Sequence, residues 1–165
     1  MSKSIVVQEI EFEAPGLVQK LLIQKRVLDH IHDHRQLTPI SPERGGQLFG
    51  VVTLNQIIIQ GITGPYSDDH SNRFSYRSCL RSAQAEINMQ HQLGRIYLGE
   101  WHTHPEVFPR PSQSDLSTIL KIQSSSKLNL NGIFMLIAGN QCNPVADFLA
   151  FQSDGDLHVF HYKEK

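Results

Sequence analysis

The sequence predicts a single domain of the α/β (α+β) class, in which a mixed β-sheet is flanked by helices. Two observations predict this fold. The 165 residues include 39% hydrophobic and 19% charged residues, an ordinary globular balance for one domain that spans residues 1–165. Strand-like and helix-like segments also alternate: a strand, a helix, several strands, a helix, a strand, a helix and three strands.

The N-terminal part is predicted to form two strands and a helix. Residues 5–12 alternate in polarity, which predicts a strand, and Ala14-Pro15-Gly16 ends it. A short strand at 21–23 leads into a helix at 24–36. The apolar residues of that helix that should face the sheet are Val27, Leu28 and Ile31.

A hairpin is predicted after the loop at 38–42, because Asn55-Gln56 separates two apolar runs. The elements predicted in this part are strands at 47–54 and 56–62, a loop at 64–72, a short strand at 73–76 and a helix at 78–93. We expect Leu80, Ala83 and Ile87 to pack that helix against the sheet, and Gly94 to end it.

The C-terminal part begins with the apolar run Ile96-Tyr97-Leu98, which predicts a buried strand. Residues 105–111 form a turn, because their prolines continue neither a strand nor a helix. The remaining predicted elements are a helix at 112–126, packed through Leu116, Ile119, Leu120 and Ile122, a strand at 132–139, and strands at 145–152 and 157–162 joined by an Asp-Gly turn.

The segment 99–115, GEWHTHPEVFPRPSQSD, is where we expect the chemistry. His102 and His104 are two residues apart, so in an extended chain both side chains face the same side. Asp115 lies in the first turn of the next helix, and the intervening turn can bring its carboxylate back over the histidines. Two neutral imidazoles and one carboxylate are the ligand set of a catalytic zinc site with an open fourth position. We therefore predict that His102, His104 and Asp115 hold one Zn²⁺ per chain.

Three features of this segment have a second interpretation. Ser112-x-x-Asp115 is also a capping-box pattern with Ser112 as the N-cap, a role that is compatible with metal binding. Glu100 should share the histidines' side of the strand, where it can accept a hydrogen bond from an imidazole or act as a rival base. Trp101 should point the other way, either into the core or as a wall that faces a substrate.

The pattern H-x-H, seven residues, S, two residues, D at 102–115 resembles the metal motif of the JAMM metalloproteases, the JAB1/MPN/Mov34 family. A second match, ERGGQLFG at 43–50, resembles the E-x-x-G-x-L-x-G-like stretch of the same family. Two matches in the right order, about 60 residues apart, are a stronger signal than a lone H-x-H. The resemblance covers residues 37–151 and implies an MPN/JAB-like fold.

The resemblance also implies roles for two further residues. Glu43 matches the glutamate that serves as general base and acid, although taken alone it reads as a solvated carboxylate at a loop end. Ser112 matches the serine that donates a hydrogen bond to the tetrahedral oxyanion. The implied activity is that of a JAMM-type zinc metalloprotease, in which metal-activated water attacks the peptide or isopeptide bond after the C-terminus of a ubiquitin-like protein.

The compact length and the GEWHTHPE context resemble stand-alone bacterial members that are encoded beside E1- and E2-like enzymes, including those of antiphage operons. The implied partners are a ubiquitin-like protein or its conjugates, and E1/E2-like enzymes. Two alternatives remain open: a non-catalytic MPN scaffold that only binds partners, and a metal hydrolase of small amides or sulfur-carrier conjugates.

Composition argues against several other classes. The net charge of −1 gives no basic footprint for nucleic acid, no apolar run reaches the ~18 residues of a membrane span, and the N-terminus lacks a signal-peptide pattern. The two cysteines lie far apart, which is typical of a cytoplasmic protein with reduced thiols.

The sequence also contains a second histidine group, His30, His32 and His34. Only His30 and His34 share a helical face. Those two could hold an ion, but no third ligand is evident nearby, so we expect surface histidines there.

Overall fold

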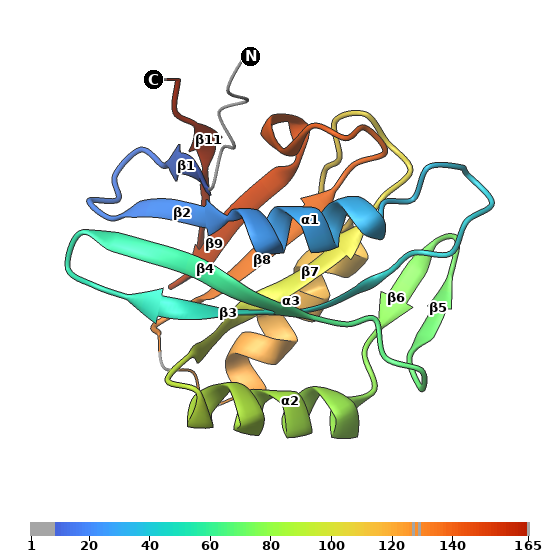
Figure 1. The fold of residues 1–165 in the computed structure, drawn as a ribbon, viewed down its shortest axis with the longest axis horizontal. Helices are drawn as coiled ribbons and strands as arrows, with labels where there is room; N and C mark the ends of the chain where they lie inside the picture. Colours follow the sequence, from blue (N-terminus) through green and yellow to red (C-terminus); the bar gives the residue numbers. More distant parts are fainter. Residues whose placement is uncertain (1–8, 127, 129, 165) are drawn as a thin grey trace, which may run out of the picture.

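The computed structural model describes residues 9–126, 128 and 130–164 (Figure 1). Among these residues, nine strands form one mixed sheet in the order β10-β9-β8-β7-β3-β4-β2-β1-β11, and β5 and β6 form a separate hairpin. The strands are β1 Glu9–Glu13, β2 Lys20–Gln24, β3 Gly45–Val52, β4 Gln56–Thr63, β5 His70–Asn72, β6 Ser75–Arg77, β7 Ile96–Thr103, β8 Ile133–Ala138, β9 Phe148–Ser153, β10 Asp156–Val159 and β11 His161–Tyr162. The helices are α1 Lys25–Asp33, α2 Leu80–Gln92 and α3 Gln113–Ser125, with a short 3₁₀ turn, η1, at Pro144–Ala146.

The main sheet curls until its two edges meet. Strands β10 and β11 lie at opposite ends of the strand order, yet only Phe160 separates them in the sequence. The N–H of Phe160 donates to the carbonyl of Leu149 in β9 at 2.8 Å, and its ring packs near that of Phe134 with centroids 5.8 Å apart. The chain therefore crosses from one edge of the sheet to the other at Phe160 and closes the larger core.

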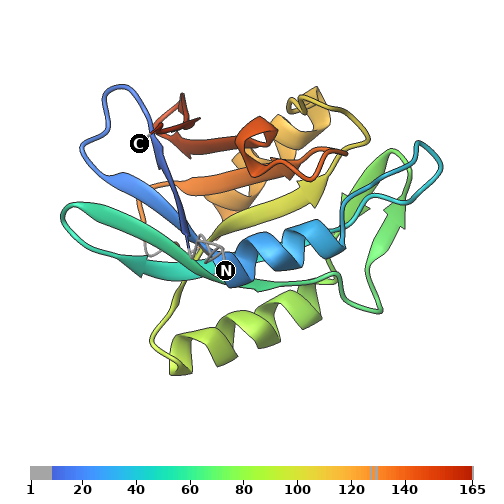
Figure 2. The same cartoon turned by 45° about the horizontal axis from the view of Figure 1, so that its top comes forward.

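Helices cover both faces of the curled sheet (Figures 1 and 2). On one face, α1 contributes Val27 and Ile31 to the larger apolar cluster, as predicted. On the other face, α3 packs Ile119 against alternate residues of β8, and α2 lies against β3 and β7. The prediction of a mixed sheet flanked by helices is confirmed, and the residues of β7 face helices on both sides.

Several boundaries differ from those predicted. Helix α1 ends at Asp33 rather than at 36, because the next residues turn inward and bury Arg35 and Gln36 outside the helix. The first predicted strand starts at residue 5, but residues 5–8 lie outside the described part of the chain.

Near the C-terminus, two predicted strands are also corrected. The strand predicted at 145–152 begins at Phe148, because Pro144–Ala146 forms the 3₁₀ turn η1. The strand predicted at 157–162 is two strands, because the chain changes sheet edge at Phe160. Neither change is visible in the local pattern of polar and apolar residues.

The segment 64–77 corrects the prediction of a long loop followed by one short strand. Residues 70–72 and 75–77 pair as the β5–β6 hairpin. The side-chain oxygen of Asn72 accepts hydrogen bonds from the N–H groups of Phe74 and Ser75 at 2.8 and 3.0 Å, and this forms the tight turn. Asp69 anchors the hairpin by accepting hydrogen bonds from the Tyr76 hydroxyl and from a backbone N–H at the start of α2.

Two residues that were predicted to pack are exposed. Leu80 is 84% exposed because it is the first residue of α2, one turn before the buried Ala83. Leu120 is 50% exposed because it is rotated by about 100° around α3 from the buried Ile119. No helix in the described residues is long and apolar enough to cross a membrane.

A buried ion pair braces the end of α1 against the β8–β9 connection. The Arg35 guanidinium donates to both carboxylate oxygens of Asp147 at 2.7 and 2.8 Å. Gly139 is bound to both partners, since its carbonyl accepts from Arg35 at 3.0 Å and its N–H donates to Asp147 at 2.9 Å. The bidentate pair therefore fixes the residues that follow β8.

We expect Asp147→Ala to lower the free energy of unfolding by about 3–5 kcal/mol, because it leaves the Arg35 charge buried without its partner. The matched control is Asp29→Ala, which breaks the exposed Lys25–Asp29 pair on α1 and should cost only about 0.3–0.5 kcal/mol. Urea unfolding monitored by circular dichroism measures both. Equal losses in the two variants would contradict a bracing role for Asp147.

Candidate metal centre

Strand β7 positions the first histidine of the centre. It lies between β3 and β8, antiparallel to the first and parallel to the second, so both of its edges are held. His102 is paired in register with Ile137 of β8, which places both side chains on the face that α3 covers. Trp101 points to the opposite face, where it is fully buried in the larger cluster. Its predicted place in the core is confirmed.

His104 follows the end of β7 and remains attached to the sheet. Its N–H donates to the carbonyl of Ala138 in β8 at 2.9 Å. The predicted turn at 105–111 then leads away, and Asn140 holds it by donating to the carbonyls of Pro105 and Glu106 at 3.2 and 2.8 Å. These contacts direct the chain toward the start of α3.

Helix α3 begins with the predicted capping box. The hydroxyl oxygen of Ser112 accepts from the N–H of Asp115 at 3.0 Å, and the carboxylate of Asp115 accepts from the N–H of Ser112 at 2.8 Å. Because the Ser112 hydroxyl is an acceptor in the cap, its own proton is free for another partner. The cap also fixes the Asp115 carboxylate, so capping and metal binding are geometrically compatible.

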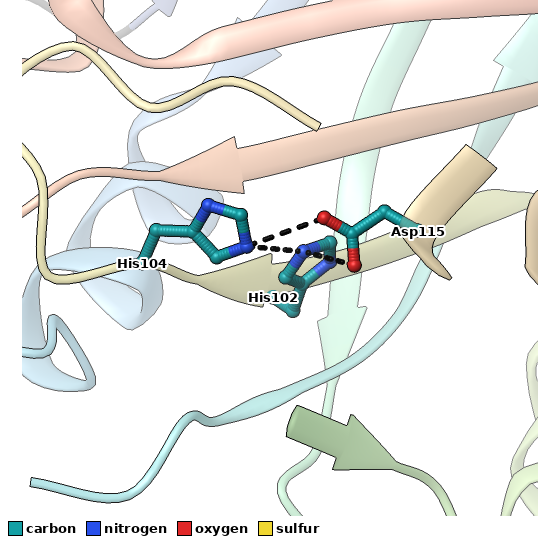
Figure 3. A group of neighbouring side chains, drawn as sticks. All are labelled: His102, His104 and Asp115. Carbon is teal, nitrogen blue, oxygen red and sulfur yellow. Dashed lines mark hydrogen bonds and ion pairs between the residues drawn. The ribbon is translucent and has the colours of Figure 1, made fainter. Parts of the chain in front are cut away.

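The structure brings His102, His104 and Asp115 together, as Figure 3 shows. The two Nε2 atoms lie 3.2 Å apart, and each lies 3.3 Å from an oxygen of Asp115. Ligands around tetrahedral zinc, at ~2.0–2.1 Å from the ion, are spaced by about 3.3 Å. The three side chains therefore fit a zinc ion in both spacing and chemistry, and their role as ligands remains a prediction.

The charges within the group favour an anionic carboxylate. Burial acts to raise the pKa of Asp115, but the contacts with His102 and His104 outweigh it and hold this pKa well below its ordinary value. Burial acts to lower the pKa of His104, whereas the Asp115 carboxylate beside it raises this pKa overall. Asp115 is therefore ionised at neutral pH, the form that binds a cation.

Glu43 lies beside these three residues although it precedes them by about 60 positions. One of its carboxylate oxygens is 3.9 Å from Nε2 of His104, and the residue is 6% exposed. It is therefore not the solvated loop carboxylate that the local sequence suggests. Burial raises the pKa of Glu43 to about 7, opposed by the charge of His104. A carboxyl group with such a pKa can both accept and return a proton near neutral pH.

Glu100 is hydrogen-bonded to residues other than the two histidines in this structure, and a role as a rival base stays a prediction. Its carboxylate accepts hydrogen bonds from the Tyr97 hydroxyl at 2.6 Å and from the Gln47 amide at 2.8 Å. A bulge at Leu98 puts Tyr97 on the same face of β7 as Glu100, where the Tyr97 hydroxyl can donate to the carboxylate. Burial raises the pKa of Glu100 to about 7. No hydrogen bond joins it to either predicted histidine ligand in the described residues.

The second histidine group is only partly at the surface. His30 of α1 and His34, the C-cap of that helix, lie on the same side, as predicted, with ring centroids 4.5 Å apart. Both rings are half-buried against Trp101, and Nε2 of His30 lies 2.6 Å from the carbonyl of Gly64. His32 points away and is exposed. The expectation of surface histidines is corrected for the first two, which are packing residues on the Trp101 side of the sheet.

Two residues beside the centre were not singled out from the sequence. Thr103, between the two histidines, is fully buried and bonds to the backbone of Arg44. Asn72, at the end of β5, accepts a hydrogen bond from the N–H of Glu43 at 2.7 Å. The contacts of Thr103 and Asn72 depend on pairing between distant segments, so the local sequence does not predict them. The one sequence feature that could have drawn attention to Thr103 is its place between the two histidines of the H-x-H pattern.

Comparison with known proteins finds a matching family and relatives that are named as isopeptidases. The model for prokaryotic homologs of the JAB domain matches residues 24–151. The chain is 33% identical over 125 residues to the CD-NTase/cGAS isopeptidase of Escherichia coli (strain TW11681), covering 73% of this chain and 77% of that protein. It is 23% identical over 157 residues to the CD-NTase/cGAS isopeptidase of Enterobacter hormaechei subsp. hoffmannii (strain UCI 50), covering 93% and 86%.

A solved structure shares the fold of this chain. The solution structure of a protein from Desulfitobacterium hafniense superposes with a TM-score of 0.57 at 17% identity, over 86% of this chain and 88% of that one. The match to the family model extends from the start of α1 into β9 and includes every residue of the candidate centre. This chain therefore belongs to the prokaryotic JAB domain family.

Proposed function

We propose that this protein is a zinc-dependent isopeptidase that hydrolyses the bond between the C-terminus of a modifier protein and its target. One observation carries the proposal: two imidazoles and a carboxylate converge at tetrahedral spacing, with the buried carboxyl group of Glu43 3.9 Å from one of them. The relatives named as isopeptidases support a hydrolase that acts on amide bonds.

Each residue has a distinct chemical task in this proposal. Glu43 accepts a proton from the water that attacks the carbonyl carbon and then gives a proton to the departing amine. The Ser112 hydroxyl, whose proton is free, donates to the oxygen that becomes negatively charged. A zinc ion held by His102, His104 and Asp115 would polarise the carbonyl and lower the pKa of water from ~15.7 toward ~7.

The proposed substrate class follows from the names of the relatives. Those proteins are called isopeptidases of CD-NTase/cGAS. We therefore propose that the modifier is a CD-NTase/cGAS-type protein, attached through its C-terminus by E1/E2-like enzymes in the cytoplasm, within an antiviral conjugation system. A ubiquitin-like protein, the modifier that the motif implied, is the second candidate, since both would present an extended C-terminal tail to the same centre.

The test is a panel of three substrates with the zinc-loaded protein. The first is a CD-NTase joined through its C-terminus to a lysine of a reporter, the second is a ubiquitin-like protein joined in the same way, and the third is a small acyl amide. Release of the reporter from the first, measured by gel and mass spectrometry, is the expected result. Release of the reporter from the second substrate alone would identify a ubiquitin-like protein as the modifier and would leave the proposed isopeptidase activity unchanged.

The same panel separates the two alternative functions. Hydrolysis of the small amide at a kcat/KM comparable to that of the conjugates would instead indicate a small-molecule hydrolase. Binding of a conjugate with no cleavage of any substrate, in protein that holds zinc, would indicate a non-catalytic scaffold and would overturn the proposed activity.

Ser112 provides a test of the oxyanion donor that can be separated from its capping role. We expect Ser112→Ala and Ser112→Gly both to lower kcat by about 10²–10³-fold, because both remove the hydroxyl donor. Their stabilities should differ, because alanine at an N-cap costs about 1 kcal/mol and glycine only a few tenths. Steady-state kinetics and urea unfolding measure the two effects. A kcat that follows the loss of stability would assign Ser112 to capping alone.

A further inference from the structure

The position of Glu43 depends on one backbone segment, since this residue precedes β3 and lies outside the main sheet. The N–H of Glu43 donates to the carbonyl of Asn72 in β5 at 2.7 Å. The backbone of the next residue, Arg44, is bound twice by Thr103. The N–H of Thr103 donates to the carbonyl of Arg44 at 2.8 Å, and the N–H of Arg44 donates to the Thr103 hydroxyl at 2.9 Å.

The second of these bonds is unusual for paired strands. β3 and β7 pair from Gly45 opposite His102, so the next opposed residues are Arg44 and Thr103. In a continued antiparallel ladder, the N–H of Arg44 would donate to the backbone carbonyl of Thr103. Here the side-chain hydroxyl takes the place of that carbonyl. The sheet ends at this point, and the threonine side chain holds the segment that carries Glu43.

Gln36 supports the same segment from the other side. This residue follows α1, is 1% exposed, and donates from its amide nitrogen to the carbonyls of Ser41 and Arg73 at 2.7 and 3.3 Å. Its amide oxygen is left for the hydroxyl of the fully buried Thr103, a long contact of 3.5 Å. Ser41 lies two residues before Glu43, and Arg73 follows Asn72. Gln36 thus connects the two sites that hold the segment of Glu43, which are Thr103 and the β5–β6 turn at Asn72.

We infer that Thr103 and Gln36 are positioning residues, which act through the Arg44 peptide and the β5–β6 turn to hold the Glu43 carboxylate at its distance from the histidines. Neither side chain has a contact with the predicted metal ligands among the described hydrogen bonds. The kinetic consequence rests on the proposed function of Glu43 as the base. The geometric consequence, the place of the carboxylate, does not.

Thr103→Val is the main test, because valine keeps the shape of threonine and removes only the hydroxyl. We expect kcat to fall by at least about tenfold, since misplacing a catalytic group by about 1 Å can cost up to ~10²-fold, while KM and zinc content stay close to those of the parent. Thr103→Ser, which restores the acceptor for Arg44, should recover most of the lost kcat. A crystal structure of the valine variant should show the Glu43 carboxylate displaced from His104.

A second variant keeps the test decisive if Thr103→Val does not fold. Gln36→Met removes all three amide contacts, to Ser41, Arg73 and Thr103, and should also lower kcat without a change in zinc content. Its matched control is Gln90→Met in α2, since Gln90 is likewise buried and bonded on both sides, to Glu86 and Arg95, at the opposite end of β7. The control should lose stability but keep kcat.

Two results would overturn the positioning role. One is a kcat in Thr103→Val or Gln36→Met no lower than that of the Gln90→Met control, and the other is an unmoved Glu43 carboxylate in their crystal structures. If the parent protein cleaves no substrate, the proposed function fails instead, and the place of Glu43 in the crystal structures still decides the inference.

Discussion

Replacing Glu43 by glutamine (Glu43→Gln) is expected to remove most turnover while the protein keeps its zinc. The amide has the shape of the carboxyl group but cannot accept a proton from water, and general-base catalysis contributes typically ~10²–10⁴-fold. Glu43 lies 3.9 Å from Nε2 of His104 and is not one of the three converging ligands, so metal content should not change. Steady-state kinetics on a cleavable conjugate, together with metal analysis of the same sample, measures both quantities.

The control for this variant is Glu106→Gln, because Glu106 is the other carboxylate near His104, 4.0 Å from its Nδ1. Its side chain is exposed, so we expect a change in turnover of no more than about twofold, as for most surface substitutions. If Glu106→Gln abolished turnover and Glu43→Gln did not, the assignment of the base would be wrong. The stability of Glu43→Gln should equal or exceed that of the parent, since glutamine removes the cost of burying a charge.

The part of the candidate centre that the sequence predicted is local. His102 and His104 share a face because residues two apart in a strand always do, and Asp115 is placed by a capping box that spans four residues. The turn at 105–111, between His104 and Asp115, was predicted from its prolines alone. None of these relationships depends on how distant strands pair, so the local sequence was sufficient to predict that the three side chains lie together.

Contacts between distant segments were not predictable in the same way. Glu43 reaches His104 only because β3 pairs with β7 and because Thr103 extends that pairing by one residue. The partner of Glu100 could not be predicted either, because a bulge at Leu98, which no local pattern marks, brings Tyr97 to the same face of β7.

The polar strands of the β5–β6 hairpin show a further limit of sequence patterns. Their residues bury almost nothing on either face, so they lack the alternation that identifies a half-buried strand. Their structure comes from the Asn72 turn and the Asp69 anchor. The split at Phe160 likewise follows from closure of the whole sheet rather than from the local sequence.

Removing the metal is expected to have a large effect on stability as well as on turnover. An ion that binds only the folded protein stabilises it by about 2.7 kcal/mol at a free concentration 100 times its Kd. Chelator-treated protein should therefore unfold at lower urea than protein with about one zinc ion per chain, and added zinc should restore both stability and turnover. Metal analysis and urea unfolding of the same preparations measure this.

The ligand variants identify which side chains hold the ion. His102→Ala should bind no zinc after dialysis and should gain no stability when zinc is added, whereas His91→Ala, at an exposed histidine of α2, should behave like the parent. For Asp115, asparagine is a better replacement than alanine, because its carbonyl can still accept the N–H of Ser112 and keep α3 capped. Loss of zinc in Asp115→Asn, with a smaller fall in the unfolding midpoint of the metal-free protein than Asp115→Ala causes, would separate the ligand from the cap; some fall is expected in both, because the charge that pairs with His102 and His104 is lost. A zinc content in His102→Ala equal to that of the parent would place the ion elsewhere and remove the basis for the proposed chemistry.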